Sequence, residues 1–197
     1  MGCMVPLKTS GDRPPLLLFH PTPGDVMGYG NLVCHLGNDQ PCYGFVARGL
    51  LKDGECHMLI EDMAEYYIEE LLTNQIPESY FLAGWCYGGI VALEAAQQLR
   101  ARGKKVAYLG MIDTMASAIR TRKVKQRIVE LKNAFLSSQV PPGHLRNDTG
   151  GWDVAAGEVD VYNIDCRHED ILKEPVVTDL AEKLVESLAR HQRQSHQ

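Results

Sequence analysis

Residues 80–94 read Tyr-Phe-Leu-Ala-Gly-Trp-Cys-Tyr-Gly-Gly-Ile-Val-Ala-Leu-Glu: a short apolar run, a turn with glycines and the start of an apolar helix. A Gly-x-Cys-x-Gly turn between a strand and a helix is typical of a nucleophile elbow, whose central residue has a strained backbone. Gly84 and Gly88 lack the side chains that would collide where the chain folds back. Amides of the following helix would stabilise a thiolate or an oxyanion beside Cys86. Cys86 is therefore the candidate nucleophile, and an inert cysteine in a glycine-containing turn is the alternative.

Two later residues fit the same chemistry. A nucleophile elbow predicts an acid and then a histidine farther along the chain, at the ends of later strands. Asp113 ends an apolar run at residues 106–112, and His168 follows another at 159–164. The alternatives are a helix-capping role for Asp113 and a surface position for His168. We predict that Cys86, Asp113 and His168 form a catalytic triad.

The oxyanion formed on such a nucleophile needs two backbone donors. The run His20-Pro21-Thr22-Pro23-Gly24 follows the first apolar segment, where a second donor would lie. Prolines have no N–H group, so Thr22 is the donor among residues 21–23. We predict an oxyanion hole made by the amides of Thr22 and Tyr87, with a plain proline-rich turn as the alternative.

Strand and helix patterns alternate along the chain. Short apolar runs closed by turn residues predict strands at 16–19, 42–46, 80–83, 106–112 and 159–162. Apolar residues three and four apart predict helices at 59–72, 89–102 and 176–191. This order predicts an α/β fold with a mainly parallel sheet and helices on both faces.

Residues 120–139 show a further helical spacing at Val124, Ile128, Leu131 and Phe135, with five basic residues at the start of the segment. One interpretation is a solvated basic face above a buried stripe. The other is a short helical lid, at about residues 115–150, whose basic end meets an acidic partner. The five basic residues are Arg120, Arg122, Lys123, Lys125 and Arg127.

Composition excludes several classes of protein. The 197 residues are 45% hydrophobic and 23% charged, which is typical of one globular domain and predicts a single domain over 1–197. A net charge of -5 argues against nucleic-acid binding. No apolar stretch is long enough to span a membrane or resembles a secretory signal, so we expect a cytoplasmic protein. The six cysteines lack metal-type spacing, so we predict no metal site.

Taken together, these motifs resemble the α/β-hydrolase thioesterase domains of nonribosomal peptide and polyketide synthases, either terminal or stand-alone editing enzymes. The resemblance is carried by the Gly-Trp-nucleophile-aromatic-Gly-Gly run at 84–89 and by the aspartate 27 positions after the nucleophile. It also covers 18–21, 60–64 and 168–175. It implies that Cys86, Asp113 and His168 are the triad.

The resemblance also implies a substrate and a partner. The acyl or peptidyl chain would arrive as a thioester on the phosphopantetheine arm of a carrier protein, and the enzyme would need no cofactor of its own. Excised from a synthase, the domain would be a monomer. Hydrolysis or cyclisation to a lactone or lactam would release the chain.

The chain departs from the family pattern at three places. Cys86 stands where most members have serine, although a serine replaced to trap an intermediate would leave the same sequence. Cys166-Arg167-His168 stands where the family has Gly-Asp-His, and 54 residues separate Asp113 from His168, fewer than usual. Two other interpretations remain: a dienelactone-hydrolase-type enzyme, which shares the Gly-x-Cys-x-Gly turn, and a non-catalytic carrier-binding module with a decayed site.

Overall fold

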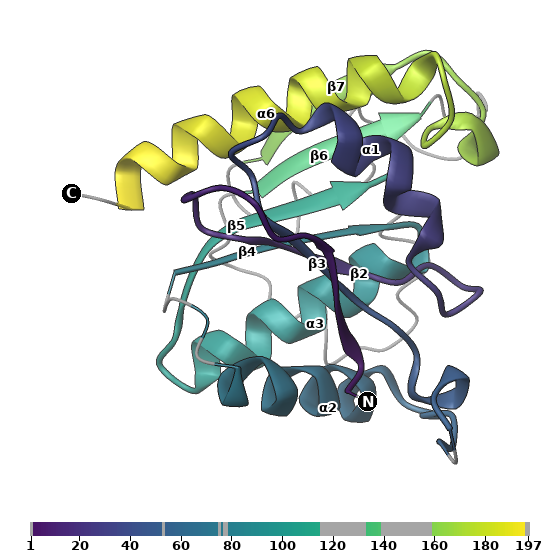
Figure 1. The fold of residues 1–197 in the computed structure, drawn as a ribbon, viewed down its shortest axis with the longest axis vertical. Coiled ribbons are helices and arrows are strands. Elements are labelled where there is room, and N and C mark those ends of the chain that lie inside the picture. Colours follow the sequence, from purple (N-terminus) through teal and green to yellow (C-terminus); the bar gives the residue numbers. More distant parts are fainter. Residues whose placement is uncertain are drawn as a thin grey trace.

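The fold is a seven-stranded sheet between two layers of helices (Figure 1). The computed structural model describes residues 2–52, 54–74, 76, 79–114, 133–138 and 159–195, and within 133–138 the backbone alone. The strands are β1 (Met4–Lys8), β2 (Leu16–Phe19), β3 (Cys42–Phe45), β4 (Ser79–Trp85), β5 (Lys105–Ile112), β6 (Asn133–Ser138) and β7 (Val159–Ile164). The helices are α1 (Gly30–His35), α2 (Ile60–Thr73), α3 (Tyr87–Ala101) and α6 (Val176–Ser195), with 3-10 turns η1 (Met27–Tyr29), η2 (Arg48–Leu50) and η4 (His168–Asp170).

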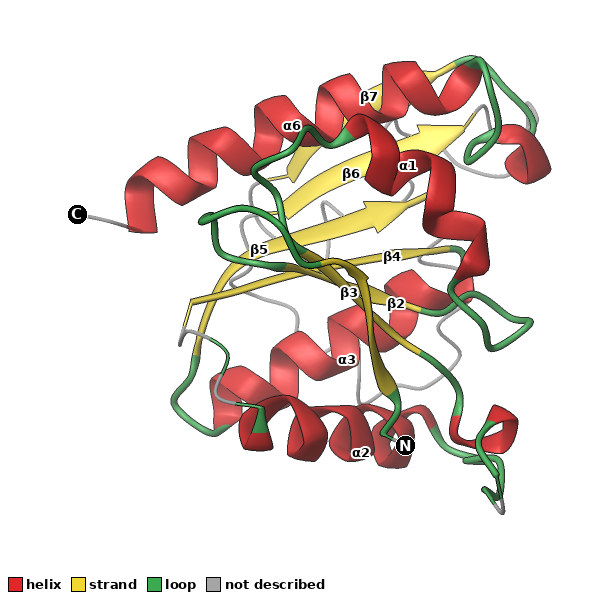
Figure 2. Ribbon diagram, in the orientation of Figure 1, coloured by secondary structure: helices red, strands yellow, loops and turns green. Residues whose placement is uncertain are grey.

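The sheet has the order β1-β3-β2-β4-β5-β6-β7. Strand β1 pairs antiparallel with β3, and every other pairing in the sheet is parallel. Figure 2 shows α2 and α3 on one face of the sheet and α1 and α6 on the other. The carboxyl ends of the parallel strands therefore meet at one edge, and this is where the candidate site residues lie.

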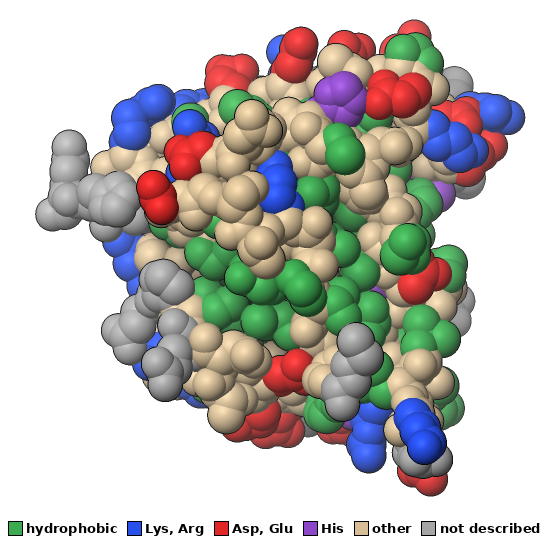
Figure 3. Space-filling model, viewed as in Figure 1, with side chains coloured by type: hydrophobic (Ala, Val, Ile, Leu, Met, Phe, Trp, Pro, Cys, Tyr) green, Lys and Arg blue, Asp and Glu red, His purple; other side chains and the backbone are tan. Residues whose placement is uncertain are grey.

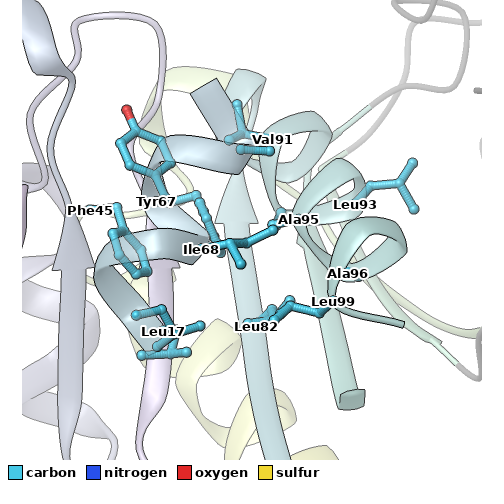
Figure 4. Close-up of a cluster of buried hydrophobic side chains, with 14 of the residues drawn as sticks. Leu17, Phe45, Tyr67, Ile68, Leu82, Val91, Leu93, Ala95, Ala96 and Leu99 are labelled. Carbon is cyan, nitrogen blue, oxygen red and sulfur yellow. The ribbon is translucent and has the colours of Figure 1, made fainter. Parts of the chain in front are cut away.

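Two hydrophobic cores hold the helix layers to the sheet. Leu17, Leu82 and Phe45 from the strands pack with Tyr67 and Ile68 of α2 and the apolar face of α3 (Figure 4). The second core joins the other face of the same strands to α1 and α6. All four residues of β2 are buried because this strand has a helix layer on both sides, as a continuous apolar run predicts.

Strand β1 is held in place by one carboxylate of α2. Glu70 accepts hydrogen bonds from the backbone amides of Cys3 and Met4 at 2.7 and 2.9 Å, and from the Cys3 thiol at 2.8 Å. Partial burial acts to raise the pKa of the Glu70 carboxyl, but these hydrogen bonds outweigh it and the pKa is lowered. The Glu70 carboxylate of α2 thus anchors the start of β1, the strand that pairs with β3.

The structure corrects one sequence prediction. Residues 133–138, expected in the helix 120–139, form strand β6 between β5 and β7. The short apolar run Ala134-Phe135-Leu136 suits either structure, and parallel partners on both sides supply the hydrogen bonds that its backbone needs. The other parts of the expected lid, 115–132 and 139–150, lie outside the described residues, as do the five basic residues.

Figure 3 shows the surface in the orientation of Figure 1. Hydrophobic side chains gather in the middle of this face, between the helix layers, and charged side chains lie mostly around them. Among the residues that the structure describes, no helix is long and apolar enough to cross a membrane.

Candidate active site

The turn between β4 and α3 holds Cys86 in a strained conformation. Its φ of 55° and ψ of −120° lie in a region that side-chain-bearing residues rarely adopt. The Cys86 amide donates to the carbonyl of Ile112 at 2.9 Å, and the Thr114 hydroxyl donates to the Cys86 carbonyl at 3.0 Å. Both bonds run to the end of β5, so the neighbouring strand holds the strained turn.

Two glycines make this turn sterically possible. A Cβ atom at Gly84 would lie 2.2 Å from the carbonyl carbon of Gly88. A Cβ atom at Gly88 would lie 2.3 Å from the carbonyl oxygen of Phe19. Backbone atoms stand in the way at both positions, and backbone cannot move aside as a flexible side chain can. The sequence-based reason for the glycines is therefore confirmed.

The structure brings Asp113 and His168 together. The Asp113 carboxylate, 7% exposed, accepts a hydrogen bond from Nδ1 of His168, whose side chain is 45% exposed. Asp113 follows β5 with a φ of 46°, and His168 begins η4 ahead of α6. The ring of Trp85, the residue before Cys86, stacks on the imidazole at 5.1 Å between centroids. With Nδ1 bound, Nε2 of His168 is the nitrogen left for proton transfer.

The two predicted oxyanion donors line one cavity. Thr22 lies in the loop after β2, and Tyr87 is the first residue of α3. The loop is closed by the Gly24 amide, which donates to the carbonyl of Pro21 at 2.9 Å. The cavity has a volume of about 330 Å³, and neither Cys86 nor His168 is among its described lining residues.

His20 has a structural role that the sequence did not indicate. It is 2% exposed, its Nδ1 lies 2.8 Å from the carbonyl of Pro21, and its Nε2 lies 2.8 Å from the hydroxyl of Tyr67. A carbonyl can only accept, so Nδ1 carries the proton and Nε2 accepts from Tyr67. Burial also lowers the pKa of His20. His20 is therefore a neutral, fully bonded support of the Thr22 loop.

Tyr29 joins the two halves of the site. This fully buried residue of η1 donates its hydroxyl to the carbonyl of Phe19 at 2.7 Å and accepts from the amide of Trp85 at 2.8 Å. Phe19 ends β2 and Trp85 ends β4, and their last register pair is Phe19 with Gly84. The hydroxyl thus satisfies two backbone groups where the strands separate. Sequence alone gives no signal for this bridge, because it depends on where the two strands end.

No metal site is present in the described part of the chain. Among those residues, no group of three or more His, Cys, Asp or Glu side chains could hold a metal ion. The six cysteines are free thiols.

A mainly parallel sheet, helices on both faces and a strained nucleophile turn after β4 define an α/β-hydrolase fold. Solved structures share it. The Vlm2 thioesterase domain aligns with a TM-score of 0.77 and 20% identity, over 93% of this chain and 97% of that one. The NocB thioesterase domain from the nocardicin cluster aligns with a TM-score of 0.77 and 22% identity, over 94% of this chain and 98% of that one. At these identities the likeness establishes the fold alone.

The sequence comparison defines the family. The Thioesterase domain family matches residues 14–138, more than half of the chain, and the chain belongs to that family. The dimodular nonribosomal peptide synthase of Bacillus subtilis (strain 168) is 41% identical over 113 residues, 57% of this chain. The malpinin synthetase of Mortierella alpina is 36% identical over 136 residues, 67% of this chain. The matched stretches span 5% and 2% of those relatives.

Proposed function

We propose that this thioesterase domain releases an acyl or peptidyl chain from a carrier-protein thioester through an acyl-enzyme on Cys86. The observation that carries the proposal is the hydrogen-bonded Asp113–His168 pair, with Trp85 stacked on His168 beside the strained Cys86 turn. Nonribosomal peptide synthases among the relatives support a carrier-bound substrate. No cofactor of the domain's own is needed in this scheme.

The chemical steps follow from the proposed triad. His168 takes the proton of the Cys86 thiol through Nε2, and the sulfur attacks the thioester carbonyl. The amides of Thr22 and Tyr87 hold the resulting oxyanion, while Asp113 stabilises the imidazolium. The bond to the phosphopantetheine sulfur then breaks, and His168 returns the proton to that leaving thiol. Water or a nucleophile within the chain attacks the acyl-enzyme in the second half.

Cysteine alters that second half. A serine would store the acyl group as an oxoester, whereas Cys86 stores a thioester, close in energy to the one it came from. A thioester reacts more readily with amines and constrained hydroxyls. Cys86 therefore favours cyclisation to a lactone or lactam over simple hydrolysis, and thioesters that carry an internal amine should release cyclic product in excess over free acid.

The direct test is intact-protein mass spectrometry with a panel of small acyl thioesters. We expect one added acyl mass on Cys86, and none in Cys86→Ala, because alanine fits the turn but has no nucleophile. Cys34→Ala removes an exposed thiol of α1 and is the matched control. Acylation that persists in Cys86→Ala would contradict the triad.

A neutral-pH thiol reagent separates the enzyme from a non-catalytic carrier-binding module. An activated Cys86 should react first and alone. Labelling of Cys86 no faster than the exposed thiols Cys34 and Cys56 would favour the module.

The carrier protein is tested through the basic segment. Carrier proteins of such synthases are typically acidic, so the positive charges of this segment would steer docking. Arg122→Glu with Lys125→Glu should slow acylation from a carrier-bound substrate at low salt and hardly alter acylation by a small thioester. Equal acylation rates of this variant and the unaltered protein on the carrier-bound substrate would contradict a role of the segment in docking.

A further inference from the structure

The cavity beside Thr22 and Tyr87 has no place yet in the proposed mechanism. Its walls come from the loop after β2, from η2 and the residue before it, from residues 56–57 and from Met63 of α2. None of its described lining residues belongs to 159–195, the segment that carries His168. The cavity thus adjoins the two proposed oxyanion donors and is not lined by the proposed general base.

The direction of the leaving group decides what this cavity can hold. His168 must reach the leaving sulfur to return its proton, so the phosphopantetheine arm lies on the His168 side of the carbonyl. The other substituent of the same carbonyl extends the opposite way. With the oxyanion at Thr22 and Tyr87, the cavity that these two residues line offers space to that substituent.

The walls fit an apolar group. Pro23, Ala47, Leu50 and Met63 supply hydrocarbon surface. Arg48 is the one permanently charged residue among the described lining, and its guanidinium lies 5.6 Å from the ring centre of Tyr66. The volume of about 330 Å³ equals roughly ten water molecules of ~30 Å³, which corresponds to an acyl segment of roughly ten non-hydrogen atoms.

Backbone hydrogen bonds fix the shape of the cavity. The Ala47 amide donates to the carbonyl of Gly24 at 2.7 Å, which joins the loop after β2 to the chain after β3. The Leu50 amide donates to the carbonyl of Ala47 at 2.9 Å. A larger side chain on this wall should therefore reduce the space instead of displacing the wall.

We propose that this cavity is the acyl subsite: it takes the apolar segment next to the reacting carbonyl and encloses roughly ten of its non-hydrogen atoms. The proposal rests on the proposed thioesterase function and deepens it. For a longer peptidyl chain, only the residue adjoining the carbonyl would be enclosed, and the remainder would extend out of the cavity.

Substitution of the wall tests the subsite. Ala47 has φ −60° and ψ 137°, which any side chain adopts, so Ala47→Trp should fold. Leu50→Trp places the same bulk at the rim, where Leu50 is 57% exposed. Leu59→Trp is the matched control, because Leu59 is equally exposed and does not line the cavity.

The measurement compares acylation by octanoyl and acetyl thioesters of N-acetylcysteamine. We expect the octanoyl-to-acetyl rate ratio to fall at least tenfold in Ala47→Trp, less in Leu50→Trp and not at all in Leu59→Trp. Unaltered ratios in both folded cavity variants would overturn the acyl subsite and leave the thioesterase proposal standing.

A binding experiment separates the two proposals. An octanoyl amide analogue of the thioester should bind the Cys86→Ala protein, and binding should be lost when Ala47→Trp is added. That result, together with a wild-type Cys86 that no thioester acylates, would retain the subsite and reject the proposed chemistry. Equal binding with and without Ala47→Trp would reject the subsite.

Discussion

The two sides of Cys86 are built differently. On the oxyanion side, His20, Tyr29 and Tyr67 are at most 2% exposed, and the hydrogen bonds of His20 and Tyr29 reach backbone atoms of the site. On the other side, His168 is 45% exposed, and the neighbouring Arg167 side chain is 74% exposed. The residues that support the oxyanion loop therefore belong to the core, although Thr22 itself is exposed, whereas His168 and its neighbour lie at the surface.

This difference separates two tasks. Oxyanion donors act by being fixed before the reaction, so a dry and fully bonded support suits them. A general base has to accept a proton, turn toward the leaving group and release the proton, which suits a residue held by one carboxylate and one stacked ring. Substitutions on the two sides should therefore fail differently: the buried side through stability and geometry together, and the exposed side through chemistry alone.

The largest effect is expected on the exposed side. His168→Ala should lower the acylation rate by a factor of at least ~10², the usual scale for loss of a general base. The thermal midpoint should hardly move, since the side chain is half exposed. A stopped-flow assay of thiol release, with thermal unfolding of the same sample, measures both. An unaltered rate would show that another group acts as base.

Tyr29→Phe should lower both the unfolding free energy and the acylation rate. It leaves the Phe19 carbonyl and the Trp85 amide without their buried partner, which costs about 1–3 kcal/mol of unfolding free energy. Acylation should also slow, with kcat reduced more than KM is raised, because the loosened strand ends carry the oxyanion loop and the nucleophile turn.

Tyr108→Phe is the matched control for Tyr29→Phe. Tyr108 is 1% exposed and belongs to the same core, but it lies within β5, away from the ends of β2 and β4. The buried Tyr108 hydroxyl bonds neither strand end, so kcat should be retained there. Equal kinetic damage in the two variants would mean that Tyr29 acts only through general stability.

His20 should make the unfolding free energy depend on pH. Burial lowers the pKa of His20 in the folded protein, while an unfolded histidine titrates near ~6.5. Below about pH 6.5 the unfolded chain binds more protons at this position, so the unfolding free energy decreases as the pH falls. His20→Gln should be less stable at pH 7 and show a shallower decrease from pH 7 to pH 5.

Denaturant unfolding at several pH values measures that slope. All other histidines are common to the two proteins, so the difference in slope belongs to position 20. Identical slopes would mean that His20 is protonated as easily in the folded chain as in the unfolded one, contrary to its burial and bonding.

The smallest effect is expected from the surface charges beside His168. Arg167 pairs with Glu169 at 3.3 Å and with Asp170 at 2.7 Å, and the Arg167 side chain is well exposed. Exposed pairs of this kind contribute little. Arg167→Ala should leave both the thermal midpoint and the acylation rate unaltered, and a clear loss of rate would show that this side is more constrained than its exposure indicates.

Local patterns were enough to predict most of the sheet and the contact between two of the candidate site residues. The strand 16–19 and the nucleophile turn are where the sequence predicts them, because a buried apolar run and a Gly-x-Cys-x-Gly turn have few alternatives. The predicted neighbours Asp113 and His168 are also in contact. The catalytic roles of all five residues stay predictions: Cys86, Asp113, His168, Thr22 and Tyr87.

The parts that sequence missed depend on long-range contacts. Strand β1 contains Pro6 and is held by Glu70, a residue of α2, and no local pattern announces that partner. The apolar residues of β6 fit the spacing of a helix as well as that of a strand. Pairing with β5 and β7 decides between the two structures. The hydrogen bonds of Tyr29 to the ends of β2 and β4, and those by which His20 supports the Thr22 loop, likewise depend on residues far apart in the sequence.

The crowding at Gly84 and Gly88 has a consequence for how such sites diversify. A side chain at either glycine would overlap backbone atoms at 2.2 or 2.3 Å, while the strained φ of Cys86 accommodates serine as readily as cysteine, since the two differ only in the sulfur or oxygen atom. Backbone sterics therefore restrict the two glycine positions, while the nucleophile position between them tolerates the exchange of one atom. If Cys86 carries the acyl group as proposed, serine in the same backbone would hold that group as an oxoester, so one atom sets how much energy the intermediate retains.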